Sequence, residues 1–67
     1  MDLKNIRTKI NLTQKDVSTQ CDITESYYCL IENGDRNPSP KIAKKIAKAL
    51  QFAKYGYDWT KFYENVV

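Results

Sequence analysis

The chain has 67 residues with a formal charge of +3, no histidine, and only two glycines and two prolines. A domain of this length buries about 60% of the surface that its unfolded chain exposes, which argues against an elaborate buried active site. The small positive charge permits a polyanionic partner without demonstrating one. Two cysteines without histidine cannot assemble a zinc-finger pattern, and no apolar segment is long enough to act as a signal peptide or to span a bilayer. We expect one domain over residues 1–67, in the cytoplasm, with no metal and no cofactor.

The N-terminal part carries the patterns of two short helices. Leu3, Ile6 and Ile10 recur at helical spacing, which predicts an amphipathic first helix. Thr13 followed by Asp16 is the pattern of a capping box, in which each side chain accepts a hydrogen bond from the other residue's backbone N–H. A second helix is therefore expected to begin after Thr13.

A third helix follows after a very short connection. Thr24 is a strong N-cap, Glu25 suits the positive end of a helix, and Gly34 can adopt the left-handed conformation that ends it. Because only a few residues around Asp22 separate the second and third helices, the two must meet at a steep angle. The segment of residues 13–34 is therefore predicted to be a helix-turn-helix.

The C-terminal part predicts two further helices. Ser39 and Pro40 are typical of an N-cap and a first helical position, and apolar side chains follow at helical spacing. After a looser stretch, Asp58 is a further N-cap and begins a fifth helix that runs toward the C-terminus. No segment shows sustained strand alternation, so the predicted fold class is all-α, a compact arrangement of five helices.

Several separated motifs occur together over nearly the whole chain. They are LTQ at residues 12–14, the apolar Val17, Ile23 and Thr24 at the end of the turn, and IENGDRNPSPKIAKKIAKAL from residue 31 onward. In this combination the chain resembles the helix-turn-helix family of phage repressors, Cro proteins and xenobiotic-response-element regulators. The resemblance implies a lambda-repressor-like DNA-binding domain in which the predicted second and third helices form the motif.

The resemblance also implies roles for three side chains. Gln14 corresponds to a residue that contacts a DNA phosphate and braces the start of the recognition helix. Arg7 and Glu32 match a family ion pair that ties the first helix to the end of the third. The chain departs from the family at Asp22, where glycine is usual, although aspartate tolerates the left-handed conformation better than most residues.

The expected reading edge lies at the start of the third helix, which in a helix-turn-helix enters the major groove. Glu25, Ser26 and Tyr27 are the nearest candidates for base or groove contact, with Leu30 one turn further along. Glutamate can accept from cytosine N4, serine can bind several bases, and tyrosine offers a hydroxyl and a ring edge. Family members often carry Arg or Gln here, and an equally good interpretation is that Glu25 only complements the helix dipole.

Phosphate contacts are expected from side chains at helix starts and on the loop after the third helix. These are Gln14, Thr24, Arg36 and Asn37. Without the family resemblance, ordinary caps and a solvated loop arginine would be the preferred explanation. The lysines of the fourth helix are explained at least as well by a solvated helix face, and we do not assign them to DNA.

The last predicted helix is rich in apolar side chains, namely Trp59, Phe62, Tyr63 and Val66. Some of them are expected to complete the core, and the rest would form a homodimer patch. Two domains set about 34 Å apart can engage successive major grooves of a palindromic site.

These expectations describe a sequence-specific double-stranded DNA-binding transcriptional regulator, a repressor of bacterial, phage or mobile-element origin. The alternative is an antitoxin or antirepressor that uses the same fold chiefly to bind a protein partner. An enzyme is not expected, because histidine is absent and no paired carboxylates share a plausible cleft. Cys21 is expected in the core, and Cys29 is expected to be partly exposed. No general base that could activate either thiol is evident in the sequence.

Overall fold

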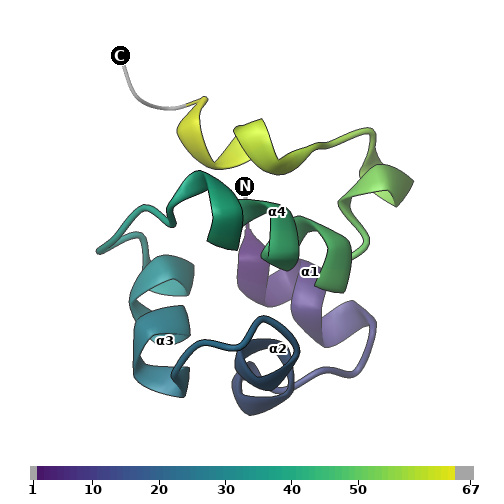
Figure 1. Cartoon of the computed structure of the whole chain (residues 1–67). Coiled ribbons are helices and arrows are strands. Elements are labelled where there is room, and N and C mark those ends of the chain that lie inside the picture. The colour runs from purple at the N-terminus through teal and green to yellow at the C-terminus, as the bar shows by residue number, and fades with distance from the viewer. Residues whose placement is uncertain (1, 65–67) are drawn as a thin grey trace.

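Four α-helices and two short 3₁₀ helices make up the computed structural model, which describes residues 2–64. α4 crosses the middle of the molecule, with α2 and α3 on one side of it and the second 3₁₀ helix, η2, on the other (Figure 1). The described residues contain no strand, so the predicted all-α fold class is confirmed. The elements are α1 (Leu3–Lys9), α2 (Gln14–Gln20), α3 (Glu25–Asn33), α4 (Pro40–Ala49), η1 (Phe52–Tyr55) and η2 (Trp59–Tyr63).

The N-terminal ends of the central helices are closed by the expected caps. At the start of α2 the Thr13 hydroxyl oxygen accepts from the Asp16 N–H at 3.0 Å, and the Asp16 carboxylate accepts from the Thr13 N–H at 2.8 Å. At the start of α3 the Thr24 hydroxyl oxygen accepts from the Tyr27 N–H at 3.1 Å. Ser39 caps α4 in the same way. Because these bonds satisfy N–H groups that a helix leaves without partners, each helix begins at a defined residue.

The helix ends and the turn depend on left-handed backbone conformations. Gly34 ends α3 with φ of 84°, as predicted. Asp22, in the turn between α2 and α3, has φ of 57°, so aspartate does take the conformation for which the family usually has glycine. Two further non-glycine residues with positive φ, Asn11 and Gln51, were not anticipated.

The C-terminal part differs in detail from the expected fifth α-helix. Asp58 does cap a helix, but its carboxylate accepts from the N–H of Thr60, two residues on, at 2.9 Å, and the helix that follows is the 3₁₀ helix η2. The stretch before it, expected to be irregular, contains η1, which ends at the left-handed Gly56. 3₁₀ helices are common in short connecting segments of this kind.

One hydrophobic core joins all four α-helices and η1. Cys21 is fully buried in it, as predicted, Tyr28 is also fully buried, and Phe52 is 1% exposed. The other core residues are Leu3, Ile6, Val17, Ile31, Ile46 and Leu50. Within residues 2–64 no helix combines the length and the apolar character needed to cross a membrane.

Candidate nucleic-acid interface

Glu32, in the last turn of α3, connects three helices. Its carboxylate accepts a hydrogen bond at 2.9 Å from Nε of Arg7 on α1 and another from the side-chain amide of Gln14, the first residue of α2. Arg7 also donates to the Leu12 carbonyl at 2.8 Å. The side chains of Arg7 and Glu32 are 10% and 4% exposed, so this shielded pair fixes the orientation of α3 more than it adds net stability.

An open groove along α3 brings together most of the candidate reading residues. Gln14, Glu25 and Ser26 line it with Cys29 and Leu30. Glu25 and Ser26 are exposed, and Leu30 is 37% exposed. Gln14 thus lies beside the start of α3, although the hydrogen bond it makes runs to Glu32 at the opposite end of that helix.

Cys29 is the groove residue that the sequence analysis did not propose. It follows Glu25 and Ser26 by about one helical turn, so it lies on the same face of α3. That spacing was visible in the sequence and could have identified it. Cys29 is half-buried, and its sulfur accepts a weak hydrogen bond from the Asn33 amide at 3.6 Å.

Tyr27 takes a different place from its neighbours. Its side chain is half-buried against the core and does not line the groove. The guanidinium carbon of Arg36 lies 5.9 Å from the centre of the Tyr27 ring, which is a cation–π distance. The ring therefore supports Arg36, and base contact by Tyr27 stays a prediction.

The loop between α3 and α4, residues 34–39, presents Arg36 and Asn37 to solvent. Its first half is tied to α3, because the N–H groups of Asp35 and Arg36 both donate to the Leu30 carbonyl, at 2.9 and 3.3 Å. Its second half contains the buried Pro38. The loop is thus packed against the fold while its polar side chains stay outside.

Thr24 lies at the other edge of the interface, before the first turn of α3. Its hydroxyl oxygen is used as the N-cap, which leaves the hydroxyl proton for an acceptor outside the chain. The helix N-terminus and this hydroxyl together favour a negatively charged group such as a phosphate.

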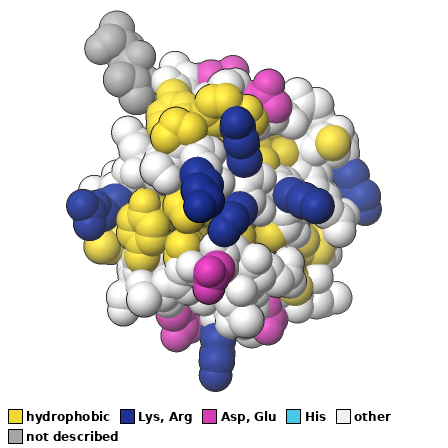
Figure 2. Space-filling view, in the orientation of Figure 1, with side chains coloured by type: hydrophobic (Ala, Val, Ile, Leu, Met, Phe, Trp, Pro, Cys, Tyr) yellow, Lys and Arg dark blue, Asp and Glu magenta, His cyan; other side chains and the backbone are white. Residues whose placement is uncertain are grey.

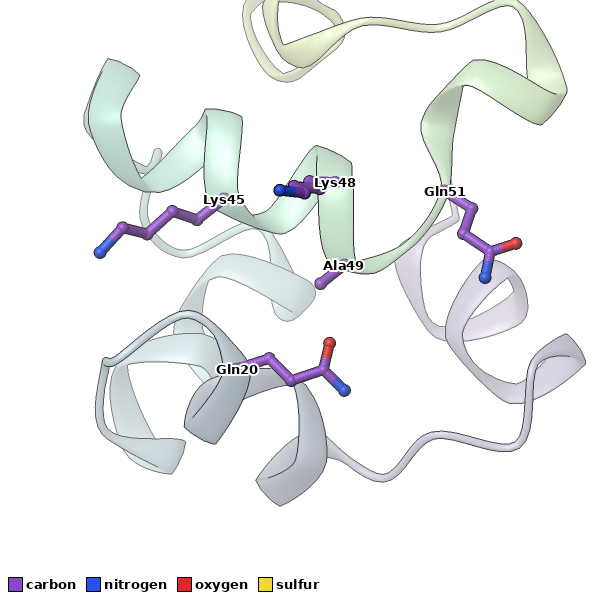
Figure 3. Close-up of a pocket in the computed structure, with 5 residues that line it drawn as sticks. All are labelled: Gln20, Lys45, Lys48, Ala49 and Gln51. Atoms are coloured by element: carbon purple, nitrogen blue, oxygen red, sulfur yellow. The ribbon is translucent and has the colours of Figure 1, made fainter.

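A different surface, on α4, carries four lysines. Figure 2 shows Lys and Arg side chains spread over α4, whose lysines are Lys41, Lys44, Lys45 and Lys48. A shallow pocket between α2 and α4 is lined by Gln20, Lys45, Lys48, Ala49 and Gln51 (Figure 3). It shares no residue with the α3 groove, and the solvated-face interpretation of these lysines remains sufficient.

Comparison with known proteins identifies relatives over most of the chain. A family model described as helix-turn-helix matches residues 3–53, a segment that contains all four α-helices and stops before η2. The chain is 42% identical over 64 residues to the uncharacterized HTH-type transcriptional regulator YqaF of Bacillus subtilis, covering 96% of this chain and 78% of that protein. It is 35% identical over 46 residues to an uncharacterized HTH-type transcriptional regulator of Archaeoglobus fulgidus, covering 69% of this chain and 65% of that protein. No solved structure matches the chain.

Proposed function

The chain belongs to the helix-turn-helix family, and we propose that it is a sequence-specific double-stranded DNA-binding regulator that represses transcription. The observation that carries this proposal is the groove along α3, where the exposed Glu25 and Ser26 and the half-exposed Cys29 stand on one helix face beside Gln14. A capped helix with a polar edge and an exposed apolar side chain suits the major groove, where base edges and thymine methyls are presented.

In this proposal the two ends of the interface bind the DNA backbone. Arg36 and Asn37 on the α3–α4 loop contact phosphates on one side of the DNA major groove. Gln14 and Thr24, at helix starts, contact phosphates on its other side. These contacts set the register, and α3 supplies the sequence preference. Blocking a promoter requires only that the domain occupy the DNA. We place this repression in the cytoplasm of a bacterium or of a cell that carries a phage or mobile element.

We also propose that two chains bind together as a homodimer through the C-terminal segment. Support comes from Trp59 and Tyr63 of η2, which are only half-buried. Phe62 stacks on Phe52 and serves the core, and Val66 lies outside the described residues. Sedimentation equilibrium is expected to show a dimer at high concentration, and a strict monomer would contradict this part of the proposal.

The experiment that tests DNA binding is selection of bound sites from random duplexes, followed by titration of the selected duplex at graded salt. A palindromic consensus and affinity that falls as salt rises are expected. Arg36→Gln should weaken binding to all sequences and lower the salt slope by about 1 for each arginine removed. Lys48→Gln removes the same charge from the α4 surface and should change neither.

A second candidate function is supported by the acidic Glu25 on the exposed edge of α3, because an acidic side chain repels phosphates. An antitoxin or antirepressor would use this edge to bind a protein partner instead of DNA. Absence of salt-sensitive DNA binding at low ionic strength would overturn the regulator proposal and favour this one.

A further inference from the structure

η2 lies outside the segment matched by the helix-turn-helix family model, yet it contacts the loop that carries Arg36 and Asn37. The Tyr63 hydroxyl on η2 donates a hydrogen bond to the carbonyl of Pro38. Tyr63 and Pro38 are 25 residues apart in the chain, so this bond is a tertiary contact. Within the described part of the chain it is the one hydrogen bond made by the backbone of residues 37 and 38.

Tyr63 belongs to a segment that packs against the rest of the fold. η2 packs along α4 (Figure 1), and the Phe62 ring stacks on the core residue Phe52 with 5.5 Å between ring centres. The Trp59 ring meets Tyr63 edge to face at 6.1 Å and is itself covered by the Lys44 ammonium at 5.1 Å. Tyr63 is therefore a fixed point of the fold against which the loop can be held.

The loop makes a second contact, through the Arg36 side chain, with Tyr27. Arg36 lies over the Tyr27 ring, and the pKa of Tyr63 is raised by burial and by the proximity of Tyr27. Two tyrosines thus contact the loop. One supports the side chain of Arg36, and the other holds the backbone two residues further on.

We infer that Tyr63 is a positioning residue that holds the α3–α4 loop in the conformation in which Arg36 and Asn37 meet the DNA backbone. The DNA part of this inference rests on the proposed function. A loop held in advance loses less conformational freedom when it binds, so releasing it weakens binding without removing any contact. A neutral hydrogen bond of this kind corresponds to a change in affinity of about three- to tenfold.

The first test uses the free protein. Tyr63→Phe keeps the ring and its contact with Trp59 but removes the donor to Pro38. The matched control is Tyr55→Phe, because Tyr55 is exposed and stacks on Tyr57 at 5.8 Å without holding the loop. Nitrogen-15 relaxation should show lower order parameters for the backbone amides of Arg36 and Asn37 in Tyr63→Phe alone, and unchanged values there would overturn the inference.

The second test measures affinity for the selected duplex in two backgrounds. Tyr63→Phe should weaken binding about three- to tenfold in the unmodified chain, and less than twofold in a chain that already carries Arg36→Gln and Asn37→Ala. Equal losses in both backgrounds would mean that Tyr63 acts through general stability and would overturn the inference. If the unmodified chain binds no duplex, the proposed function fails and the DNA role of Tyr63 fails with it, while the relaxation experiment still decides whether Tyr63 holds the loop.

Discussion

Two cysteine side chains occupy contrasting places in this protein. Cys21 is fully buried, and burial raises the pKa of its thiol. Cys29 is half-exposed and lines the α3 groove. Because the thiolate is the reactive form, iodoacetamide at neutral pH should modify Cys29 well before Cys21, as mass spectrometry of the partially alkylated chain will show.

The same reaction reports on the DNA interface. If α3 enters the major groove, saturating selected duplex should slow alkylation of Cys29, because the covered thiol can react only in the unbound chain. Cys21 is the internal control, since burial protects it with or without DNA. An alkylation rate of Cys29 that duplex DNA leaves unchanged would place the interface elsewhere.

Glu32 is the side chain on which three helices depend. Glu32→Gln leaves the shielded Arg7 guanidinium without an opposite charge, so the free energy of unfolding should fall by about 3 kcal/mol, measured by urea denaturation at neutral pH. The control is Glu64→Gln, because Glu64 pairs with Lys61 at 2.7 Å on the surface and its loss should have no measurable effect.

If Glu32→Gln does not fold, the pair Arg7→Met and Glu32→Met removes both charges at once. That double variant should recover most of the lost stability, because two apolar side chains leave no charge uncompensated. A double variant as unstable as Glu32→Gln would show that the geometry of the hydrogen bonds, and not the unpaired charge, dominates.

At the scale of the helices, the starts were predictable because caps are local. Each capping oxygen at Thr13, Thr24 and Ser39 binds an N–H within three residues, so a short sequence pattern contains the whole interaction. η1 and the 3₁₀ form of η2 were not predictable in this way. Their conformation depends on where aromatic side chains find space against the core, which no local pattern records.

The capping box of α2 should make stability depend on pH. Hydrogen bonds from the backbone and side chain of Thr13 lower the pKa of Asp16 in the folded chain. A carboxyl with a depressed pKa adds stability that is fully present above the pKa of the unfolded chain, about 3.9, and that is lost as pH falls through the folded value. The stability difference between the unmodified chain and Asp16→Asn should therefore be largest at neutral pH and shrink below about pH 4.

Urea denaturation from pH 2.5 to 7 measures this difference. Asp58 also has a lowered pKa, caused by hydrogen bonds from Thr60, so it contributes to the acid sensitivity of both chains and cancels in the comparison. A gap between the two chains that stays constant with pH would show that the Asp16 carboxylate does not stabilise the cap.

The turn between α2 and α3 carries local strain at Asp22. A non-glycine residue in the left-handed region costs roughly 1–2 kcal/mol of folding free energy, and the cost for aspartate is at the low end of this range. Asp22→Gly should therefore raise the free energy of unfolding by up to about 1 kcal/mol. Asp22→Ala should lower it. Equal stabilities of the three chains in urea would mean that the turn relaxes and stores no strain.

At the scale of the whole molecule, the candidate interface was predictable only in part. The start of α3 and the loop followed from the position of the helix-turn-helix. The hydrogen bond from Gln14 to Glu32 and the placement of Arg36 over Tyr27 join residues that no short pattern connects. They appear only once the core has set the angle between α2 and α3.

Aromatic side chains in the C-terminal part of the chain also close the core. Phe52 lies between Tyr57, edge to face at 6.0 Å, and Phe62, stacked at 5.5 Å. Phe62→Ala would uncover one side of Phe52, which is 1% exposed in the intact chain. Because Phe62 is itself half-buried, we expect a loss of about 2 kcal/mol, less than for a fully buried phenylalanine.

Phe62→Ala distinguishes a role of Phe62 in closing the core of one chain from a role in the homodimer interface. If Phe62 closes the core, Phe62→Ala lowers the free energy of unfolding at protein concentrations where the chain is monomeric, while Tyr55→Ala, on an exposed side chain, changes it by about 0.5 kcal/mol or less. If Phe62 serves mainly the dimer, monomer stability is unchanged and sedimentation shows weaker self-association instead. The stacking on Phe52 favours the first outcome, which would leave only the exposed parts of Trp59 and Tyr63 available to a second copy of the chain.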